Sequence, residues 1–591
     1  MAYSRFRQQH PDFQPHGPAF NDEDGVPLYE APYQDLLAEI VRRNDVASLL
    51  LYNDSPNTTV FWKAYQTYYC HPLINATESG SFNVLKTLLK IYLADSTLTE
   101  PINAYLERVH SSPINDACAA ADRELMLWLL HQDPPLGTLH DRSVDGETPL
   151  FSAARALGTN DIDVAGTIAS RHQKRDQSVR SEDFICFLLD KGCSVPNSDF
   201  YVHYHGTKKP SHLDLPRAEL SDTVLGAAIP HASYQMVSRL IAEGANIYAR
   251  QKWHNNNGVR FSGDQVTVVH IAAHFWNLEA MKALADNFGQ AGLAAMSSMT
   301  DDAGRLPLHW ALNGYWDNRT EMDDWDDQEE ITDHIIRTIE MLLEGNPDAL
   351  SIRDQEGANA FHYAVTCNSS LAGILPVVKM LLGTKPPPLI LSARNHLGWT
   401  VLETAIDSYG RVRRGNPSVQ FLDMLIALLE HGADGRTCNA QSQNLLHKVA
   451  MCFRDTGCAD IPIIEKLLEY VNVNDADVDG HTPLHFMVRH LSRVNAVQHL
   501  IVRGANVNVV DNKGNSPLHE AMRGQLVSSL PSDQSKTSRE KMIKVLVDAG
   551  ASMYQSNAAG QTPPQLLHEL TEMERRRAQN FGGRRGRGRG G

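Results

Sequence analysis

The stretch DGHTPLHFMVRHLSRVNAVQHLIVRGANVNVVDNKGNSPLHEA, residues 479–521, shows one short pattern twice. It opens with GHTPLHFMV (480–488) and runs into GNSPLHEAM (514–522), so the two copies start 34 residues apart. A third copy, GRLPLHWAL (304–312), lies far upstream. A Pro-Leu-His triplet that returns at a fixed spacing predicts an internal repeat, and a repeat decides the whole fold.

Relatives of this box can be followed along almost the entire chain. The second position of the box, the proline of Thr-Pro-Leu-His, can be identified at twelve places. Proline occupies it at residues 72, 113, 149, 307, 483, 517 and 563, and other apolar residues occupy it at 224, 268, 360, 401 and 445. The steps between them amount to roughly one period of 33–34 residues, most with an insertion.

A second apolar stretch follows most boxes, as in QMVSRLIAEGANI (235–247) and FLDMLIALLEHGAD (421–434). Its apolar residues recur every three and four positions, which predicts a helix with one buried face. Several of these stretches end in Gly-Ala, a typical helix stop, and Asp/Asn/Gly turns lead to the next box. The unit is therefore turn, helix, short loop, helix and a glycine-rich exit.

This unit resembles the ankyrin repeat, most clearly at 479–570, with weaker copies elsewhere and a further helix pair without a box at 36–51. The resemblance implies an all-α solenoid of stacked helix pairs with turn or hairpin connections and long loop insertions. We expect a disordered segment at 1–33, the solenoid at 34–570, and a disordered Arg/Gly-rich tail at 571–591. Long insertions fall near 159–181, 194–221, 253–265, 313–334, 407–419 and 523–540.

Six boxes carry histidine at one position: His270, His309, His362, His447, His485 and His519. Other boxes place Ile74, Asn115, Phe151, Gly226, Glu403 or Gln565 there. In the ankyrin family this imidazole hydrogen-bonds backbone between adjacent turns, so the resemblance implies a structural role. A catalytic histidine would also need an orienting partner and a reacting group.

Composition and motifs give no sign of an enzyme, a cofactor or a metal site. The sequence has no GxxxxGK(S/T), GxSxG or HExxH motif, and no GxGxxG opens a helix after a strand. His203, His205 and His212 lie in an insertion, and Cys452 and Cys458 lack a partner pair at zinc spacing. The acidic run WDNRTEMDDWDDQEE (316–330) lacks the spacing of a calcium loop. We expect a solvated acidic loop there, with docking of a basic partner as the alternative.

The chain shows no signal-peptide pattern and no apolar run long enough to span a membrane. Its eight cysteines are scattered, as in reduced intracellular proteins. We expect a protein of the cytoplasm or nucleus that is a monomer and has no membrane association.

Protein binding is expected on the concave face and the inserted loops. Four aromatic residues are candidate contacts: Trp310, Trp316, Trp325 and Tyr363. For Trp310 and Tyr363, which follow a box histidine directly, a role in the core is an equal alternative.

The tail RRRAQNFGGRRGRGRGG (575–591) has seven arginines and no acidic residue, whereas the net charge of the chain is −16. It resembles the RG/RGG boxes of RNA-associated proteins, which implies nucleic-acid contact through Phe581, Arg584, Arg585, Arg587 and Arg589. Docking on an acidic protein surface, including this protein's own, and a solvated unused end are the alternatives.

The sequence thus favours a non-enzymatic interaction scaffold or adaptor. The alternative is a nuclear regulatory factor, a transcription co-regulator or RNA-associated protein, whose tail contacts nucleic acid. A ubiquitin-ligase substrate receptor is a weaker hypothesis, because the N-terminal helix pair lacks the Leu-Pro opening of an F-box. An enzyme hidden in the insertions is also a weaker hypothesis, because the sequence has no catalytic motif.

Overall fold

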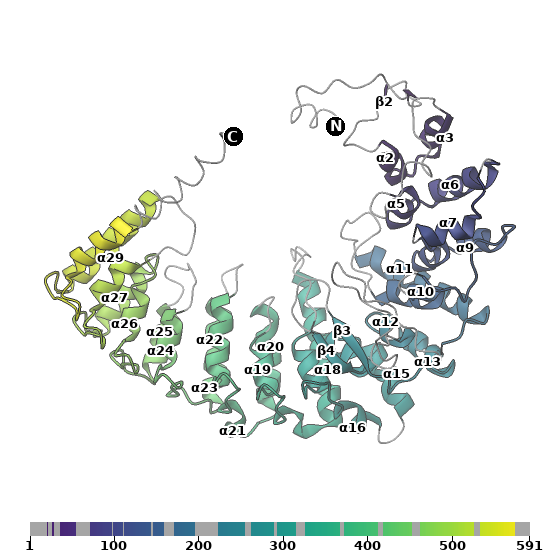
Figure 1. Cartoon of the computed structure of the whole chain (residues 1–591). Helices are drawn as coiled ribbons and strands as arrows, with labels where there is room; N and C mark the ends of the chain where they lie inside the picture. Colours follow the sequence, from purple (N-terminus) through teal and green to yellow (C-terminus); the bar gives the residue numbers. More distant parts are fainter. Residues whose placement is uncertain are drawn as a thin grey trace, which may run out of the picture. The chain divides into compact units, whose positions relative to one another are not determined.

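The computed structural model describes residues 20–21, 27–28, 36–54, 71–96, 98–109, 111–143, 146–158, 171–195, 223–254, 262–288, 292–314, 325–366, 371–411, 418–451, 461–524 and 532–573. They form two compact units, Met1–Asp302 and Ala303–Gly591, and each is described by itself. Both units are stacks of helix pairs, as the sequence predicts (Figure 1).

In the N-terminal unit, the first helices of the pairs contact one another in chain order. They are α2 (Leu36–Arg42), α5 (Pro72–Glu78), α8 (Pro113–Ala119), α10 (Pro149–Gly158), α12 (Val224–Ala228) and α14 (Val268–His274). Behind them stand α3 (Val46–Asp54), α6 (Phe82–Ala94), α9 (Arg123–Leu130), α11 (Arg171–Asp190), α13 (Tyr234–Ala242) and α15 (Leu278–Phe288). Two further helices belong to this unit: α7 (Ile102–Arg108) lies between the second and third pairs, and α16 (Gly292–Ser297) follows the last pair.

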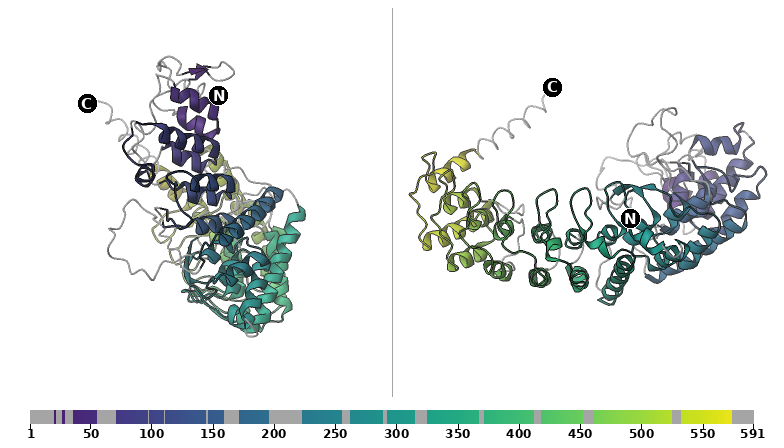
Figure 2. Two further views of the ribbon diagram at one scale, coloured as in Figure 1. Left: turned by 90° about the vertical axis from the view of Figure 1, so that its right-hand side faces the viewer. Right: turned by 90° about the horizontal axis from the view of Figure 1, so that it is seen from below.

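The C-terminal unit has the same two rows, which can be followed from teal to yellow in Figures 1 and 2. The first row is α17 (Pro307–Leu312), α19 (Ala360–Ala364), α22 (Val401–Arg411), α24 (Leu445–Met451), α26 (Pro483–Met487) and α28 (Pro517–Arg523). The second row is α18 (Trp325–Gly345), α20 (Leu371–Gly383), α23 (Ser418–Glu430), α25 (Ile461–Leu468), α27 (Val494–Val502) and α29 (Ser532–Asp548). The short helices η2 (Pro347–Leu350) and α21 (Pro388–Leu391) connect pairs, and residues 563–573 form a last helix.

Most residues of the first-row helices are buried. Every residue of α26 and of α17 is buried. Proline at the first helical position costs nothing there, because its missing N–H would have no partner within the helix. Small residues let neighbouring helices approach closely: the Cα of Gly158, at the end of α10, packs against the carbonyl of Ala227 in α12.

Several insertions differ from the expectation of plain loops, and helices α11 and α29 begin inside two of them, at Arg171 and Ser532. Residues near 253–265 form an antiparallel hairpin of β3 (Gln251–His254) and β4 (Ser262–Val266), whose register shifts between Gln251 and Trp253. Helix α18 begins at Trp325, so residues 325–330 of the acidic run are helical and not a loop. Acidic residues stabilise a helix N-terminus through its dipole, which explains why this segment can extend the helix.

The described residues of the N-terminal segment form one short strand pair. Strand β1 (Phe20–Asn21) pairs antiparallel with β2 (Pro27–Leu28). Within the part of the chain that the structure describes, no helix is both long and apolar enough to cross a membrane.

Candidate protein-interaction site

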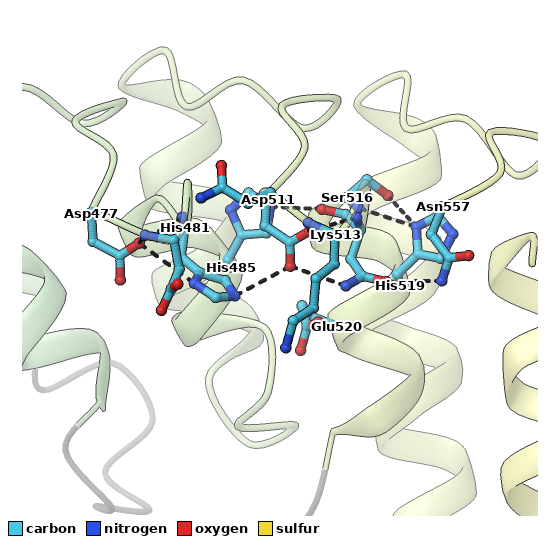
Figure 3. A network of polar contacts seen from close by, with 12 residues as sticks. Asp477, His481, His485, Asp511, Lys513, Ser516, His519, Glu520 and Asn557 are labelled. Atoms are coloured by element: carbon cyan, nitrogen blue, oxygen red, sulfur yellow. Dashed lines mark hydrogen bonds and ion pairs between the residues drawn. The ribbon is translucent and has the colours of Figure 1, made fainter. Parts of the chain in front are cut away.

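Four box histidines, His362, His447, His485 and His519, each hydrogen-bond the backbone of the next repeat. In His485, Nδ1 accepts the backbone N–H of Thr482 at 3.0 Å, and Nε2 donates to the carbonyl oxygen of Asn515 at 3.1 Å (Figure 3). The same Nε2 bond reaches a carbonyl in the following repeat from His362 to Trp399, from His447 to His481 and from His519 to Gln561, at 3.0–3.1 Å. An imidazole that accepts at Nδ1 and donates at Nε2 is neutral, with both nitrogens in use.

Burial keeps these histidines neutral in the folded protein. Desolvation lowers the pKa of His485 to about 4, and it also lowers the pKa of His362, His447 and His519. His270 and His309 are fully buried too, and their Nδ1 atoms accept the N–H of Thr267 and Leu306. The hydrogen bond to the backbone of the adjacent turn, which the resemblance implied, is therefore confirmed for His362, His447, His485 and His519.

Repeats without the histidine fill its place with other groups. Asn115 Nδ2 donates to the carbonyl of Glu147 at 2.8 Å, the equivalent of the carbonyl that His485 reaches. A Glu403 carboxylate oxygen accepts the N–H of Thr400 at 2.8 Å, and Gln565 accepts that of Thr562 at 2.9 Å.

At Gly226 the replacement comes from the inserted hairpin. A Cβ at Gly226 would lie 2.3 Å from the Oε1 of Gln251 on β3. That Oε1 accepts the N–H and the hydroxyl of Thr223, at 3.3 and 3.1 Å, which is the task of histidine Nδ1 elsewhere. The role of Gln251 could not be predicted from the sequence, because this residue lies 25 positions after Gly226 and only the folded β3–β4 hairpin places it beside the box.

The turns before the boxes of the C-terminal unit share one internal frame. An Asp or Asn side chain accepts the backbone N–H of the residue four positions later, at 2.8–3.0 Å. These anchors are Asp354, Asn395, Asn439, Asp477, Asp511 and Asn557. In five of the six turns a glycine with positive φ closes the turn, and Ser442 with φ 58° closes the sixth.

His481 lies between two anchors of this frame (Figure 3). Its ring lies between Asp477 and Asp511, with Nδ1 3.5 Å from one carboxylate and Nε2 3.3 Å from the other. Burial raises the pKa of both carboxyls, but hydrogen bonds, led by those from Gln443 to Asp477 and from Asn515 to Asp511, outweigh burial and lower it. Both anchors are therefore ionised at neutral pH.

Backbone hydrogen bonds also join neighbouring turns. The N–H of Val478 donates to the carbonyl of Gln441 at 3.0 Å, that of Asn512 to Asp479 at 2.8 Å, and that of Ala558 to Lys513 at 2.9 Å. The turns are thus joined mainly through their backbone, and one apex side chain adds to this row, because Asn512 Nδ2 donates to the carbonyl of Val478 at 3.0 Å.

Two apex residues of each turn are exposed, and they differ in chemistry from repeat to repeat. We name them the tip pairs: Gln355–Glu356, His396–Leu397, Ala440–Gln441, Val478–Asp479, Asn512–Lys513 and Ala558–Ala559. Leu397 is 66% exposed and Val478 57% exposed. A fixed frame that presents variable apolar, acidic, basic and amide groups is suited to recognising a protein surface.

The described candidates of the sequence analysis, Trp310, Trp325 and Tyr363, are not members of the tip pairs. Trp310 is fully buried, as the core alternative requires, and its ring lies 5.3 Å from the guanidinium of Arg305. Tyr363 is half-buried and its hydroxyl donates to the anchor Asp354. Trp325 begins α18. Other candidates lie outside the described residues: Trp316, Phe581, Arg584, Arg585, Arg587, Arg589, His203, His205, His212, Cys452 and Cys458.

Comparison with known proteins agrees with the repeat geometry. The family model of ankyrin repeats, in 3 copies, matches residues 417–511 and 446–557. No curated protein matches the sequence. Among solved structures, the chain is similar to the ankyrin repeat domain of Bcl-3, a unique member of the IkappaB protein family. The identity is 22% and the TM-score 0.30, with 45% of this chain and 95% of that chain covered.

The family match and the box geometry support each other. The match covers the boxes of His447, His485 and His519, and the same histidine bond recurs outside it at His362. Ankyrin repeats are generally protein–protein interaction modules, so protein partners are expected here. The chain is therefore an ankyrin-repeat protein.

Proposed function

We propose that this protein is a non-enzymatic interaction scaffold or adaptor that binds protein partners through the tip pairs of its C-terminal unit. The observation that carries the proposal is the contrast within each turn. The anchors are buried or half-buried and bonded in one way, whereas the tip pairs are exposed and vary.

Such a row supports binding for two physical reasons. Its backbone is already held by hydrogen bonds between turns, so little conformational entropy is lost when a partner docks. It also sets exposed apolar groups, Leu397 and Val478, among charged ones, Glu356, Asp479 and Lys513. Apolar contacts within a polar rim are the usual composition of a protein interface.

The test is affinity purification of the intact chain with partners identified by mass spectrometry, followed by calorimetry with the purified partner. A Leu397→Ser/Val478→Ser variant should lose the partner or bind it at least about tenfold more weakly, because two apolar contacts are lost. Val502→Ser is the matched control, since Val502 on α27 is 82% exposed but lies outside the turns. Equal binding by all three proteins would exclude the tip pairs as the contact surface.

A nuclear regulatory role is the second candidate, and the charge of the tail favours it. Seven arginines without an acidic residue in 575–591 suit weak, salt-dependent contact with nucleic acid. Deleting 575–591 should then reduce RNA recovery and nuclear accumulation, while binding through the tip pairs persists. If the deletion changes neither, the adaptor acts without nucleic acid, in the cytoplasm or the nucleus.

A further inference from the structure

A cavity of about 670 Å3 lies in the N-terminal unit, between α7, the start of α8 and the loop 136–143. This volume falls within the range of small-ligand pockets, roughly 300–1,000 Å3. The connecting helix α7 supplies one wall, and Gly137 lies in another with φ 144°. A Cβ on Gly137 would lie 3.3 Å from Asp141 Oδ2, so the loop relies on glycine to bring this carboxylate close to the start of α8.

Two buried polar side chains line the cavity with hydrogen-bonding capacity to spare. Ser111 is 8% exposed and Asn115 4% exposed. The Nδ2 of Asn115 is used by Glu147 and Ser152. Among the residues that the structure describes, neither Asn115 Oδ1 nor Ser111 Oγ has a hydrogen-bond partner. Because unsatisfied buried polar atoms are unfavourable, this wall is suited to a ligand that brings N–H donors.

The outer part of the cavity adds charged groups. Glu107 and Asp141 are exposed and line it. Asp141 Oδ2 accepts the N–H of Thr138 at 2.7 Å, and a carboxylate has lone pairs for several more donors. The one cation of the lining, Arg142, donates to the carbonyl of Gly146 at 2.8 Å. Because the lining has two carboxylates and one guanidinium, its net charge is negative.

Apolar side chains complete the walls. Leu106, Ile114 and Leu136 line the cavity and are almost fully buried. Surfaces of this kind accommodate the methylene groups of a long side chain whose charged end reaches polar partners.

We propose that this cavity binds the arginine side chain of a polypeptide. A guanidinium has five N–H donors and no acceptor, which matches the oxygens of Asn115, Ser111, Glu107 and Asp141, while its aliphatic stem packs on Leu106 and Leu136. A lysine offers only three donors and no planar fork. The site lies in the other unit from the tip pairs, so it goes beyond the function proposed above and can fail independently of it.

The arginine can come from a partner or from this chain, whose residues 575–591 include seven arginines. The probe is a fluorescein-labelled Gly-Arg-Gly-Arg-Gly peptide, the sequence of residues 586–590. Its binding is measured by fluorescence anisotropy with the full chain and with a chain that lacks 575–591. Tighter binding after the deletion assigns the site to the tail in cis, and unchanged binding assigns it to a partner.

Three variants test the residues. Glu107→Gln, Asp141→Asn and Ser111→Ala should each weaken the peptide, the first two by about tenfold because each removes a charged hydrogen-bond acceptor. Glu279→Gln on α15, an exposed carboxylate outside the cavity, is the control for general charge and should change nothing. A peptide with citrulline in place of arginine keeps the shape without the charge and should bind at least about tenfold more weakly.

The proposal is overturned if the peptide binds neither the full chain nor the chain that lacks 575–591. It is equally overturned if Glu279→Gln weakens binding as much as Asp141→Asn, since the peptide would then sense only the overall negative charge. Thermal unfolding of each variant shows that it is folded. Ser111→Ala is expected to unfold no earlier than the wild type, because the hydroxyl that it removes has no described partner.

Discussion

The Nε2 atom of His485 lies 3.1 Å from the carbonyl oxygen of Asn515, 30 residues further along the chain. Because Nδ1 of the same ring holds the N–H of Thr482, one side chain closes the start of its own helix and fastens the next turn. The stability of the stack should depend on this ring more than on any exposed histidine.

His485→Ala is therefore expected to destabilise the protein by about 2–4 kcal/mol, since it leaves a buried N–H and a buried carbonyl without partners. The measurement is the free energy of urea unfolding followed by circular dichroism. His396→Ala, the same substitution at an exposed tip pair, should change it by less than about 0.5 kcal/mol. Equal effects of the two substitutions would contradict a bridging role for His485.

The same histidines should make stability fall in mildly acidic solution. The pKa of His485 is about 4 in the folded protein and 6.5 when unperturbed. Between these values the unfolded chain binds a proton that the folded chain does not, so a decrease in pH lowers the free energy of the unfolded state and destabilises the fold. His485 alone should then cost about 3 kcal/mol between pH 7.5 and 4.

The control keeps the hydrogen bond but not the titration. His485→Asn presents an amide donor, as Asn115 does at the equivalent position. The decrease in its unfolding free energy between pH 7.5 and 4 should be about 3 kcal/mol smaller than that of the wild type.

Asp477 and Asp511 affect stability in another pH range. Because their pKa values are lowered, they stabilise the fold above pH 3.8, and this contribution is lost below it. A loss confined to pH below 3.8 would show that the histidines do not contribute.

What could be predicted from the sequence was local or periodic. The Thr-Pro-Leu-His box specifies a helix start through proline and the residue before it, so the first-row helices followed from the pattern, whereas the role of His485 followed from the resemblance to ankyrin repeats. The start of α18 at Trp325 did not, because charge alone does not distinguish a solvated loop from the first turn of a helix. The tip pairs were also missed as a set, since their defining property is exposure on a common frame. Asp511 and Lys513 look alike in polarity, but only the folded turn makes one an anchor and the other an apex.

A third prediction concerns the repeat in which Gly226 takes the place of the histidine. Gln251→Ala should destabilise the protein by about 1–3 kcal/mol, because the N–H of Thr223 loses its acceptor and a cavity opens beside Gly226. Adding Gly226→His to this variant should restore much of the loss, whereas Gly226→His alone should destabilise, since its side chain would collide with Gln251. A double-mutant cycle on unfolding free energies measures this coupling. Additive effects would mean that Gln251 does not replace the histidine.

The fourth prediction tests how closely neighbouring repeats approach. A Cβ added at Gly158, the last residue of α10, would lie 2.0 Å from the carbonyl oxygen of Ala227 in α12, and this contact is with backbone that cannot rotate away. Gly158→Ala should therefore cost about 1–3 kcal/mol by forcing the two helices apart. Gly383→Ala is the matched control, because Gly383 also ends its helix, α20, and an added Cβ there meets no atom within 4 Å. The control should be neutral or slightly stabilising, since alanine restricts the unfolded chain more than glycine does. If thermal unfolding midpoints shift equally in both variants, the change reflects glycine in general and not the contact between α10 and α12.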